Sequence, residues 1–233
     1  MSGFLFTAIP YLALVLAVVG GLYRYFTKRF SYSSMSSQML ENRLLFWGSV
    51  PWHYGIIPIL LAHLFSGLFP GTAARILRGP WRLFVLECIG IVLGFFTVFG
   101  IAVLITRRLR RPSPVHKTTS VMDGILLAVL LAQTVTGVLT ALFHRWGSLW
   151  YLDTASPWFW SIVGLHPDPA KVAALPGLVN FHMVDGFIVI LLFPFTRLVH
   201  VFTVPLDYLW RTYQIVVWNR RTWRTPDRVE AAK

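Results

Sequence analysis

The sequence contains few charged residues. Only 13% of its 233 residues are Asp, Glu, Lys or Arg, about half the share that is usual in a soluble domain, whereas 56% are hydrophobic. Several hydrophobic runs are longer than 18 residues, which is the length expected of membrane-spanning helices. These features exclude a soluble globular fold.

Cysteine is almost absent, and the single Cys88 excludes several kinds of site. An internal disulfide, a four-cysteine iron–sulfur cluster, a zinc ribbon and the Cys-x-x-Cys-His attachment of c-type haem all need more than one cysteine. Any cofactor must therefore be bound by other side chains.

Five hydrophobic segments are long enough to cross a membrane. The sequence therefore predicts an all-α, five-span transmembrane helix bundle, with no large domain outside the membrane. The first segment has no basic region before it and no cleavage site of small residues after it, so it is expected to remain as a helix. The predicted spans are Phe4 to Tyr25, Pro51 to Phe69, Leu83 to Thr106, Val121 to Phe143 and Val179 to Phe202.

Acidic residues are also scarce: 9 Asp and Glu accompany 21 Lys and Arg, giving a net charge of +12. The basic residues lie in short segments between the hydrophobic runs, a pattern that reflects topology and argues against nucleic acid as a partner. Sixteen fall on one side of the predicted membrane and five on the other. Connections on the cytoplasmic side of a membrane protein usually contain more Lys and Arg. We therefore expect the N-terminus outside and the C-terminus in the cytoplasm.

Two domains are predicted from this layout. Residues 1–206 would form the five-helix bundle, in which the tryptophan-rich connection 144–178 lies at the level of the lipid headgroups. Residues 207–233 would form a basic cytoplasmic docking segment. This segment contains several aromatic residues, which a disordered tail would lack, so we expect it to bind a cytoplasmic partner in preference to the lipid surface.

Four of the seven histidines fall within two predicted spans. The second span contains His53 and His63, and the fifth contains His182 and His200. These spans run in opposite directions, so His53 and His200 are expected at the inner level and His63 and His182 at the outer level. The other three, in the connections, are expected to have surface roles.

Two imidazoles at one level suit a six-coordinate haem iron, which leaves no open position for a substrate and favours electron transfer. Zinc would need four ligands or an open position. The alternatives are hydrogen bonds between helices or the lining of a transport path. Four histidines paired in this way favour two non-covalent b-type haems.

The spacing of the histidines supports this arrangement unevenly. His182 and His200 are 18 residues apart, which is five helical turns, so they are predicted to point the same way about 27 Å apart. His53 and His63 differ in direction by about 80° at an axial distance of about 15 Å. Pro58 lies between them and could bend the helix and change its phase.

Gly67 and Gly186 each follow one of the predicted outer ligands by four residues. They therefore lie on the ligand's own face of the helix, where a missing side chain leaves room for a flat macrocycle. The alternative is that they are ordinary small residues at contacts between helices.

The sequence resembles the gamma subunit, or cytochrome b subunit, of membrane-bound respiratory nitrate reductase over nearly its whole length. The two histidine intervals are the most specific part of the likeness. The other matching segments are Ser36–Leu40 (SSQML), Arg107–Leu109 at the end of the third span, Leu191–Val201 (LLFPFTRLVHV) and Val204–Pro205.

The resemblance implies a diheme subunit in the cytoplasmic (inner) membrane that oxidises quinol on the outer side. It would pass the electrons to an iron–sulfur (beta) subunit, which feeds a molybdenum catalytic (alpha) subunit that reduces nitrate. His63 and His182 would hold the distal haem, and His53 and His200 the proximal one. Arg82 occupies the position of a basic residue that the family uses for quinol, although the family has lysine there.

Asp185 is a departure from the family pattern, which is apolar at this position. It follows His182 by three residues, on the same face, and could accept a quinol proton or tune the outer haem. A hydrogen bond within the bundle is the alternative that we favour. Arg197 precedes His200 by three residues and is expected to pair with haem propionates in preference to lipid headgroups. Glu87 is a weaker candidate for proton exit.

Two other functions remain open at this stage. The first is a b-type haem membrane anchor of another respiratory oxidoreductase, which the metal content of the copurifying subunits would distinguish. The second is a transporter or scaffold without a redox role, in which the histidines move protons or pack helices. Such a protein would be colourless.

Overall fold

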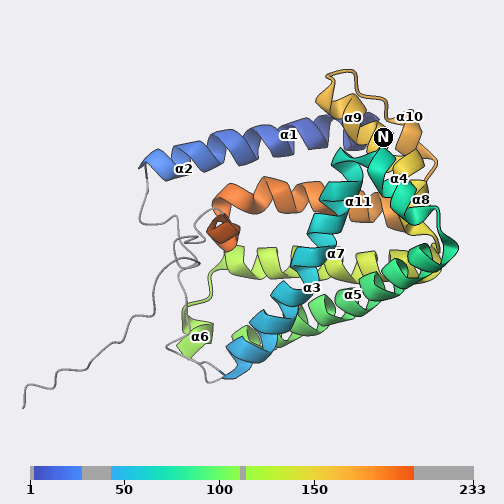
Figure 1. Ribbon diagram of the computed structural model, residues 1–233. Helices are drawn as coiled ribbons and strands as arrows, with labels where there is room; N and C mark the ends of the chain where they lie inside the picture. Colours follow the sequence, from blue (N-terminus) through green and yellow to red (C-terminus); the bar gives the residue numbers. More distant parts are fainter. Residues whose placement is uncertain (1–2, 28–42, 111–113, 202–233) are drawn as a thin grey trace, which may run out of the picture. The chain divides into compact units, whose positions relative to one another are not determined.

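Helices make up most of the described part of the chain, and five of them are long and apolar enough to cross a membrane (Figure 1). The computed structural model describes residues 3–27, 43–110 and 114–201, which fall within a compact unit of residues 1–203. The predicted all-α, five-span bundle is therefore confirmed. The spans are Phe4–Thr27, Arg43–Leu68, Pro80–Leu109, Val121–Phe143 and Gly177–Phe195.

Some sequence predictions fall on residues outside this description. They are the motif Ser36–Leu40, the segment Val204–Pro205 and the basic docking segment 207–233.

The first span alternates between π-helical and α-helical turns. Its four pieces are η1 (Phe4–Ala8), α1 (Ile9–Val15), η2 (Leu16–Gly20) and α2 (Gly21–Thr27). The fourth span, α7 (Val121–Phe143), has the predicted boundaries. Its N-terminus is fixed by a capping box, in which Ser120 and Asp123 each accept a hydrogen bond from the other's backbone N–H.

The second and third spans are longer than predicted. α3 (Arg43–Leu68) begins well before the predicted start at Pro51 and continues through both Pro51 and Pro58. Membrane helices tolerate internal prolines because neighbouring groups satisfy the freed carbonyls. α5 (Pro80–Leu109) begins at a proline, which needs no N–H partner in the first turn.

Backbone contact between α3 and α5 depends on glycine. A Cβ atom on Gly55 would lie 2.6 Å from the Leu93 carbonyl oxygen, and one on Gly100 would lie 2.6 Å from the Trp52 amide nitrogen. Small residues at such contacts let membrane helices approach closely. α5 also contacts α7, and α7 contacts α11 (Gly177–Leu192). α11 in turn contacts α1.

The connection between the fourth and fifth spans folds into short helices: α8 (Gly147–Asp153), α9 (Ala155–Val163) and α10 (Ala170–Ala173). Trp158 of α9 is buried in a cluster with Phe6, Ile162 and Val172, and its indole N–H donates to the Phe6 carbonyl at 3.0 Å. The Tyr11 hydroxyl donates to the Ile162 carbonyl at 2.9 Å. These contacts fix the connection to the first span. Two other short helices are α4 (Pro70–Leu77) and α6 (Pro114–Lys117).

The fifth span does not continue as an α-helix to His200, so the predicted spacing of five α-helical turns between His182 and His200 is wrong. α11 ends at Leu192 and is followed by the 3₁₀ segment η4 (Phe193–Phe195). Pro194 has no N–H to continue the α-helical ladder, and its ring would clash with the carbonyl of the preceding turn. Thr196 is extended, and His200 lies in a second 3₁₀ segment, η5 (Arg197–Val201).

Candidate functional site

The structure brings His53 of α3 and His200 of η5 together. Their ring centres lie 6.1 Å apart, and the ring planes meet at 77°. Two metal–imidazole bonds of about 2 Å in line would place the two ring centres about 6 Å apart. The spacing of the His53/His200 pair therefore fits two imidazoles that would bind one metal.

Hydrogen bonds fix which nitrogen each ring can offer. Nδ1 of His53 lies 2.7 Å from the Ser49 carbonyl oxygen, and Nδ1 of His200 lies 2.7 Å from that of Arg197. A carbonyl only accepts, so Nδ1 is the protonated nitrogen in both rings and Nε2 has the lone pair that binds a metal. Metal-binding histidines in proteins are typically oriented in this way.

His63 and His182 have the same tautomer. Nδ1 of His63 lies 2.8 Å from the Ile59 carbonyl oxygen. Nδ1 of His182 lies 3.2 Å from the Thr136 hydroxyl, whose proton is directed to the Ala132 carbonyl at 2.7 Å, so the hydroxyl accepts from Nδ1. All four histidines therefore present Nε2 as the metal-binding atom.

The His63/His182 pair is not arranged as the other pair is. The two imidazoles are near enough to interact electrostatically. The His63 ring, however, meets Tyr151 of α8 edge-on, with ring centres 5.9 Å apart, and the Tyr151 hydroxyl donates to the His63 carbonyl at 3.3 Å. Burial raises the pKa of Tyr151, so its hydroxyl remains a donor at neutral pH.

The His182 ring packs against α7. A Cβ atom on Gly137 would lie 2.9 Å from Cε1 of His182. The amide nitrogen of Gln133 lies 3.5 Å from Nε2 of His182, on the side where a metal would bind. Gln133, Thr136 and Gly137 thus form one face of α7 around this ring, and sequence reasoning missed all three. Polar residues inside a predicted span were the available signal.

Gly67 and Gly186 face different neighbours. A Cβ atom on Gly67 would lie 3.1 Å from the Tyr151 hydroxyl, and the Gly67 carbonyl accepts from the Trp160 indole N–H at 2.9 Å. A Cβ atom on Gly186 would lie 3.3 Å from the Gln133 amide nitrogen. Each glycine is therefore close to a residue that contacts one of these histidines: Tyr151 contacts His63, and Gln133 contacts His182.

Asp185 is buried in α11, with 5% of its surface exposed. Its Oδ2 atom has no hydrogen-bond partner among the described residues. The hydrogen bond that sequence reasoning favoured is therefore not seen at this oxygen. Oε1 of Gln133, on α7, is also buried without a partner in that part of the chain. Unpaired buried polar atoms of this kind indicate a water or another group that completes the site.

Arg197 forms a two-point ion pair with Asp123 of α7. Nε lies 2.8 Å from Oδ1, and Nη2 lies 3.1 Å from Oδ2. Arg108 of α5 also reaches Oδ2 of Asp123, at 3.3 Å. Sequence reasoning missed Asp123 as an ion-pair residue, because its two arginine partners are distant in sequence and no local pattern pairs them with it.

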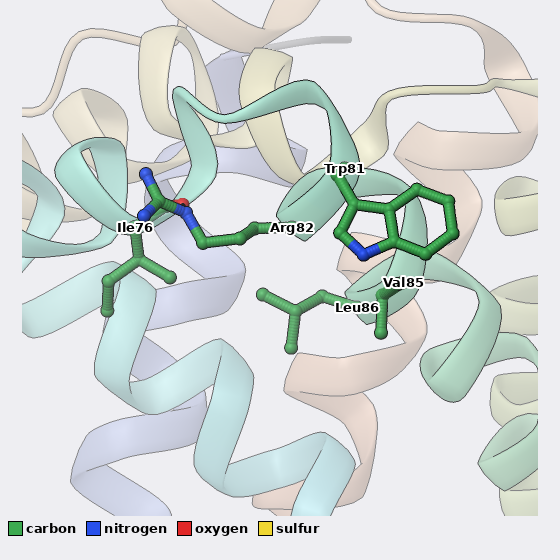
Figure 2. A pocket seen from close by; sticks show the side chains of 5 residues that line it. All are labelled: Ile76, Trp81, Arg82, Val85 and Leu86. Atoms are coloured by element: carbon green, nitrogen blue, oxygen red, sulfur yellow. The ribbon is translucent and has the colours of Figure 1, made fainter.

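Arg82 lines a shallow apolar pocket at the start of α5 (Figure 2). Its side chain extends toward Ile76, where Nε donates to the Ile76 carbonyl at 2.9 Å and Nη2 donates to the Arg75 carbonyl at 3.4 Å. Nη1 takes part in none of the described hydrogen bonds. The other lining residues are Ile76, Trp81, Val85 and Leu86.

Glu87 has a structural partner that sequence reasoning did not foresee. Its carboxylate accepts from the backbone N–H groups of Trp146 and Ser148, both at 3.2 Å. Trp146 has a φ of +63°, in the left-handed region, at the turn before α8. Glu87 thus fixes the start of the short helix that positions Tyr151.

Among the described residues, no group of three or more His, Cys, Asp and Glu side chains gathers as a metal site. The arrangement offers two imidazoles at a time. This donor set fits a metal whose other ligands come from a macrocycle, as in haem.

Known proteins resemble this chain over most of its length. Residues 2–219 match the family described as nitrate reductase gamma subunit. The nitrate reductase gamma chain of Bacillus subtilis (strain 168) is 34% identical over 226 residues, which cover 95% of this chain and 100% of that protein. The respiratory nitrate reductase 2 gamma chain of Escherichia coli (strain K12) is 32% identical over 224 residues, covering 93% and 96%.

A third relative is larger. The nitrate reductase-like protein NarX of Mycobacterium tuberculosis (strain ATCC 25618 / H37Rv) is 35% identical over 222 residues, which cover 92% of this chain but 34% of that protein. The family match includes all five spans and the four paired histidines. The chain therefore belongs to the nitrate reductase gamma subunit family.

Proposed function

We propose that this chain is the cytochrome b subunit of a respiratory nitrate reductase. It would oxidise quinol near the outer side of the cytoplasmic membrane and pass the electrons through two b haems to a partner. The main support is the His53/His200 pair, with ring centres 6.1 Å apart and both Nδ1 protons directed to backbone carbonyls. A pair that only packs helices would not need this spacing together with this tautomer.

A b haem held by two imidazoles would supply one-electron transfer and would not bind a substrate at its iron. His53 and His200 would hold the inner haem, and His63 and His182 the outer one. The carbonyl and hydroxyl partners orient the rings and raise the basicity of Nε2. Gly67 and Gly186 would leave room for the outer macrocycle.

Arg197 would bind a propionate of the inner haem. Arg197 lies three residues before His200, and its guanidinium has five N–H donors in a planar fork that suits a carboxylate. Binding of a propionate would place a second anion beside a side chain that already has one. Arg108 contributes a second positive charge at the same place.

Arg82 and Asp185 would act on the quinol. The pocket beside Arg82 is lined by apolar side chains, which suit a hydrophobic ring, while the guanidinium can donate to a quinol oxygen. Oxidation of one quinol to quinone releases two electrons and two protons. Asp185 has a buried oxygen without a partner among the described residues, and it would accept one of these protons.

Quinol oxidation at the outer level would release protons outside while the electrons move inward. Each electron then moves against the membrane potential, at a cost of about 2.3 kcal/mol per 100 mV. The reaction would thereby conserve energy as a proton gradient.

The electrons would pass to an iron–sulfur (beta) subunit and then to a molybdenum (alpha) subunit that reduces nitrate. The relatives named as gamma chains support such an assembly. The basic segment 207–233 would dock this partner. Removal of the residues after Tyr208 is expected to release the soluble subunits from membranes, with release measured by immunoblot after sedimentation. If they sediment as in the full-length strain, the docking role of this segment is wrong.

The haem assignment is tested by optical redox titration of the purified complex. We expect two b haems in the wild type and one in each alanine variant of His53, His63, His182 and His200. The matched control is His166→Ala, because His166 is exposed in the connection between spans. A colourless wild type, or two haems in all four variants, would contradict the proposal and favour a scaffold or transporter.

A further inference from the structure

His200 differs from the other three proposed ligands because it does not lie in an α-helix. It lies in the 3₁₀ segment η5, after the extended residue Thr196 (φ −122°, ψ −176°). Runs of 3₁₀ helix are short and have weaker hydrogen-bond geometry than α-helix. Other contacts must therefore hold this ligand in place.

A chain of contacts connects His200 to Asp123 through Arg197. The Arg197 carbonyl accepts from Nδ1 of His200 at 2.7 Å, while the Arg197 guanidinium donates to both carboxylate oxygens of Asp123. One residue thus links the orientation of the imidazole to the position of the carboxylate. Planar two-point contacts of this kind fix the relative orientation of the two side chains as well as stabilising their charges.

Asp123 is well suited to act as the fixed end of this chain. It is buried, with 5% of its surface exposed. The capping box with Ser120 holds it at the start of α7, and Arg108 of α5 lies 3.3 Å from its Oδ2. Contacts within α7 and from α5 therefore hold the carboxylate, and His200 belongs to neither helix.

Arg24 of α2 supports the same segment from another side. Its Nη1 atom donates to the Pro194 carbonyl at 2.7 Å and to the Thr196 carbonyl at 2.9 Å. These carbonyls lie just beyond the end of α11, where the helical ladder offers no partner. The break in the fifth span is thus held by charged residues of other helices.

We propose that Asp123 is a positioning residue for His200 and that, through Arg197, it sets the orientation of this imidazole and the reduction potential of the haem it holds. This inference rests on the proposed haem function. It applies to one haem only, because Nδ1 of His63 bonds to the carbonyl of Ile59 in its own helix and Nδ1 of His182 bonds to Thr136.

Two effects are expected when the negative charge is removed in Asp123→Asn. A nearby carboxylate stabilises the more positive, oxidised haem, so its loss raises the potential of the His53/His200 haem. We expect at least a tenfold change in the reduction equilibrium, which is about 59 mV upward for one electron. The low-spin electron paramagnetic resonance (EPR) spectrum would also change, because it depends on the angle between the two imidazole planes, which is 77° for His53 and His200 in this structure.

The test is a redox titration and an EPR spectrum of the complex with Asp123→Asn, Asp123→Glu and Arg197→Lys. The glutamate variant keeps the charge and is expected to restore part of the wild-type potential. The lysine variant keeps a positive charge but loses the planar contact, so it is expected to change the EPR spectrum. The control is Asp168→Asn, which removes an exposed ion pair with Lys171.

Each outcome supports or overturns the inference. A change confined to the His53/His200 haem, or loss of that haem alone, supports it. Unchanged potential and EPR spectrum in Asp123→Asn overturn it. If Asp123→Asn does not assemble, an unchanged spectrum in Arg197→Lys overturns it instead. A wild type without haem, or with both haems after His200→Ala, would refute the proposed function itself.

Discussion

The rings of His53 and His200 meet edge-on, with their centres 6.1 Å apart, although one belongs to a long α-helix and the other to a short 3₁₀ segment. The contact joins α3 to the end of the fifth span. In the proposed function, this is the last point at which this chain holds the electron before it passes to a partner.

The two histidine pairs should therefore have separable kinetic roles. In His200→Ala, quinol is expected to reduce the haem that remains, while electron transfer to nitrate falls by more than about 100-fold, beyond the usual effect of changing a group that only supports a metal ligand. Stopped-flow absorbance measures the reduction of haem by quinol. The rate at which nitrite forms from nitrate measures the electron transfer to nitrate. In His63→Ala, by contrast, quinol should not reduce the haem that remains at a useful rate. Equal nitrate reduction in His200→Ala and wild type would contradict the assignment.

Arg82→Ala should impair quinol oxidation without loss of haem. The guanidinium would donate a charge-assisted hydrogen bond, and loss of such a bond costs about 1.5–3 kcal/mol, so kcat/KM for quinol is expected to fall about tenfold or more. The control is Arg78→Ala, an exposed arginine outside the pocket. Steady-state kinetics with a soluble quinol analogue provide the measurement. If both variants oxidise quinol alike, Arg82 is not part of the site.

Sequence reasoning predicted the features that depend on composition and helical direction. The five spans follow from hydropathy, and the pairing of His53 with His200 follows from antiparallel spans. The end of α11 at Leu192 was missed because most residues up to Val201 are apolar, and hydropathy does not distinguish α-helix from 3₁₀ helix. Pro194 was the local signal for that break.

Contacts between distant residues were the other part that sequence could not predict. Arg197 and Asp123 are 74 positions apart, and Glu87 and Ser148 are 61 apart. Each pair is set by the packing of helices, which a single sequence does not specify. The expectation that Arg197 pairs with haem propionates stays a prediction, and its carboxylate partner Asp123 was not foreseen.

Asp185→Asn should slow quinol oxidation while both haems remain. An amide cannot accept the quinol proton as a carboxylate does, and loss of a general base typically costs about 100-fold or more. The change is nearly isosteric, so helix packing should be preserved. Asp153→Asn, at the exposed end of α8, is the control. Wild-type quinol kinetics in Asp185→Asn would show that this carboxylate takes no part in proton transfer.

The close contact of α3 with α5 predicts that alanine substitution lowers stability at Gly55 but not at Gly90. In Gly55→Ala, the new Cβ would lie 2.6 Å from the Leu93 carbonyl oxygen and 3.0 Å from the Thr97 amide nitrogen, both backbone atoms. Overpacking of this kind costs about 1–3 kcal/mol, so the unfolding midpoint of the detergent-solubilised complex should fall. Gly90→Ala is the matched control on α5, because a Cβ there would meet nothing within 4 Å and alanine favours the helix. Thermal unfolding followed by tryptophan fluorescence compares the two, and an equal midpoint in both variants would mean that α3 and α5 do not approach so closely.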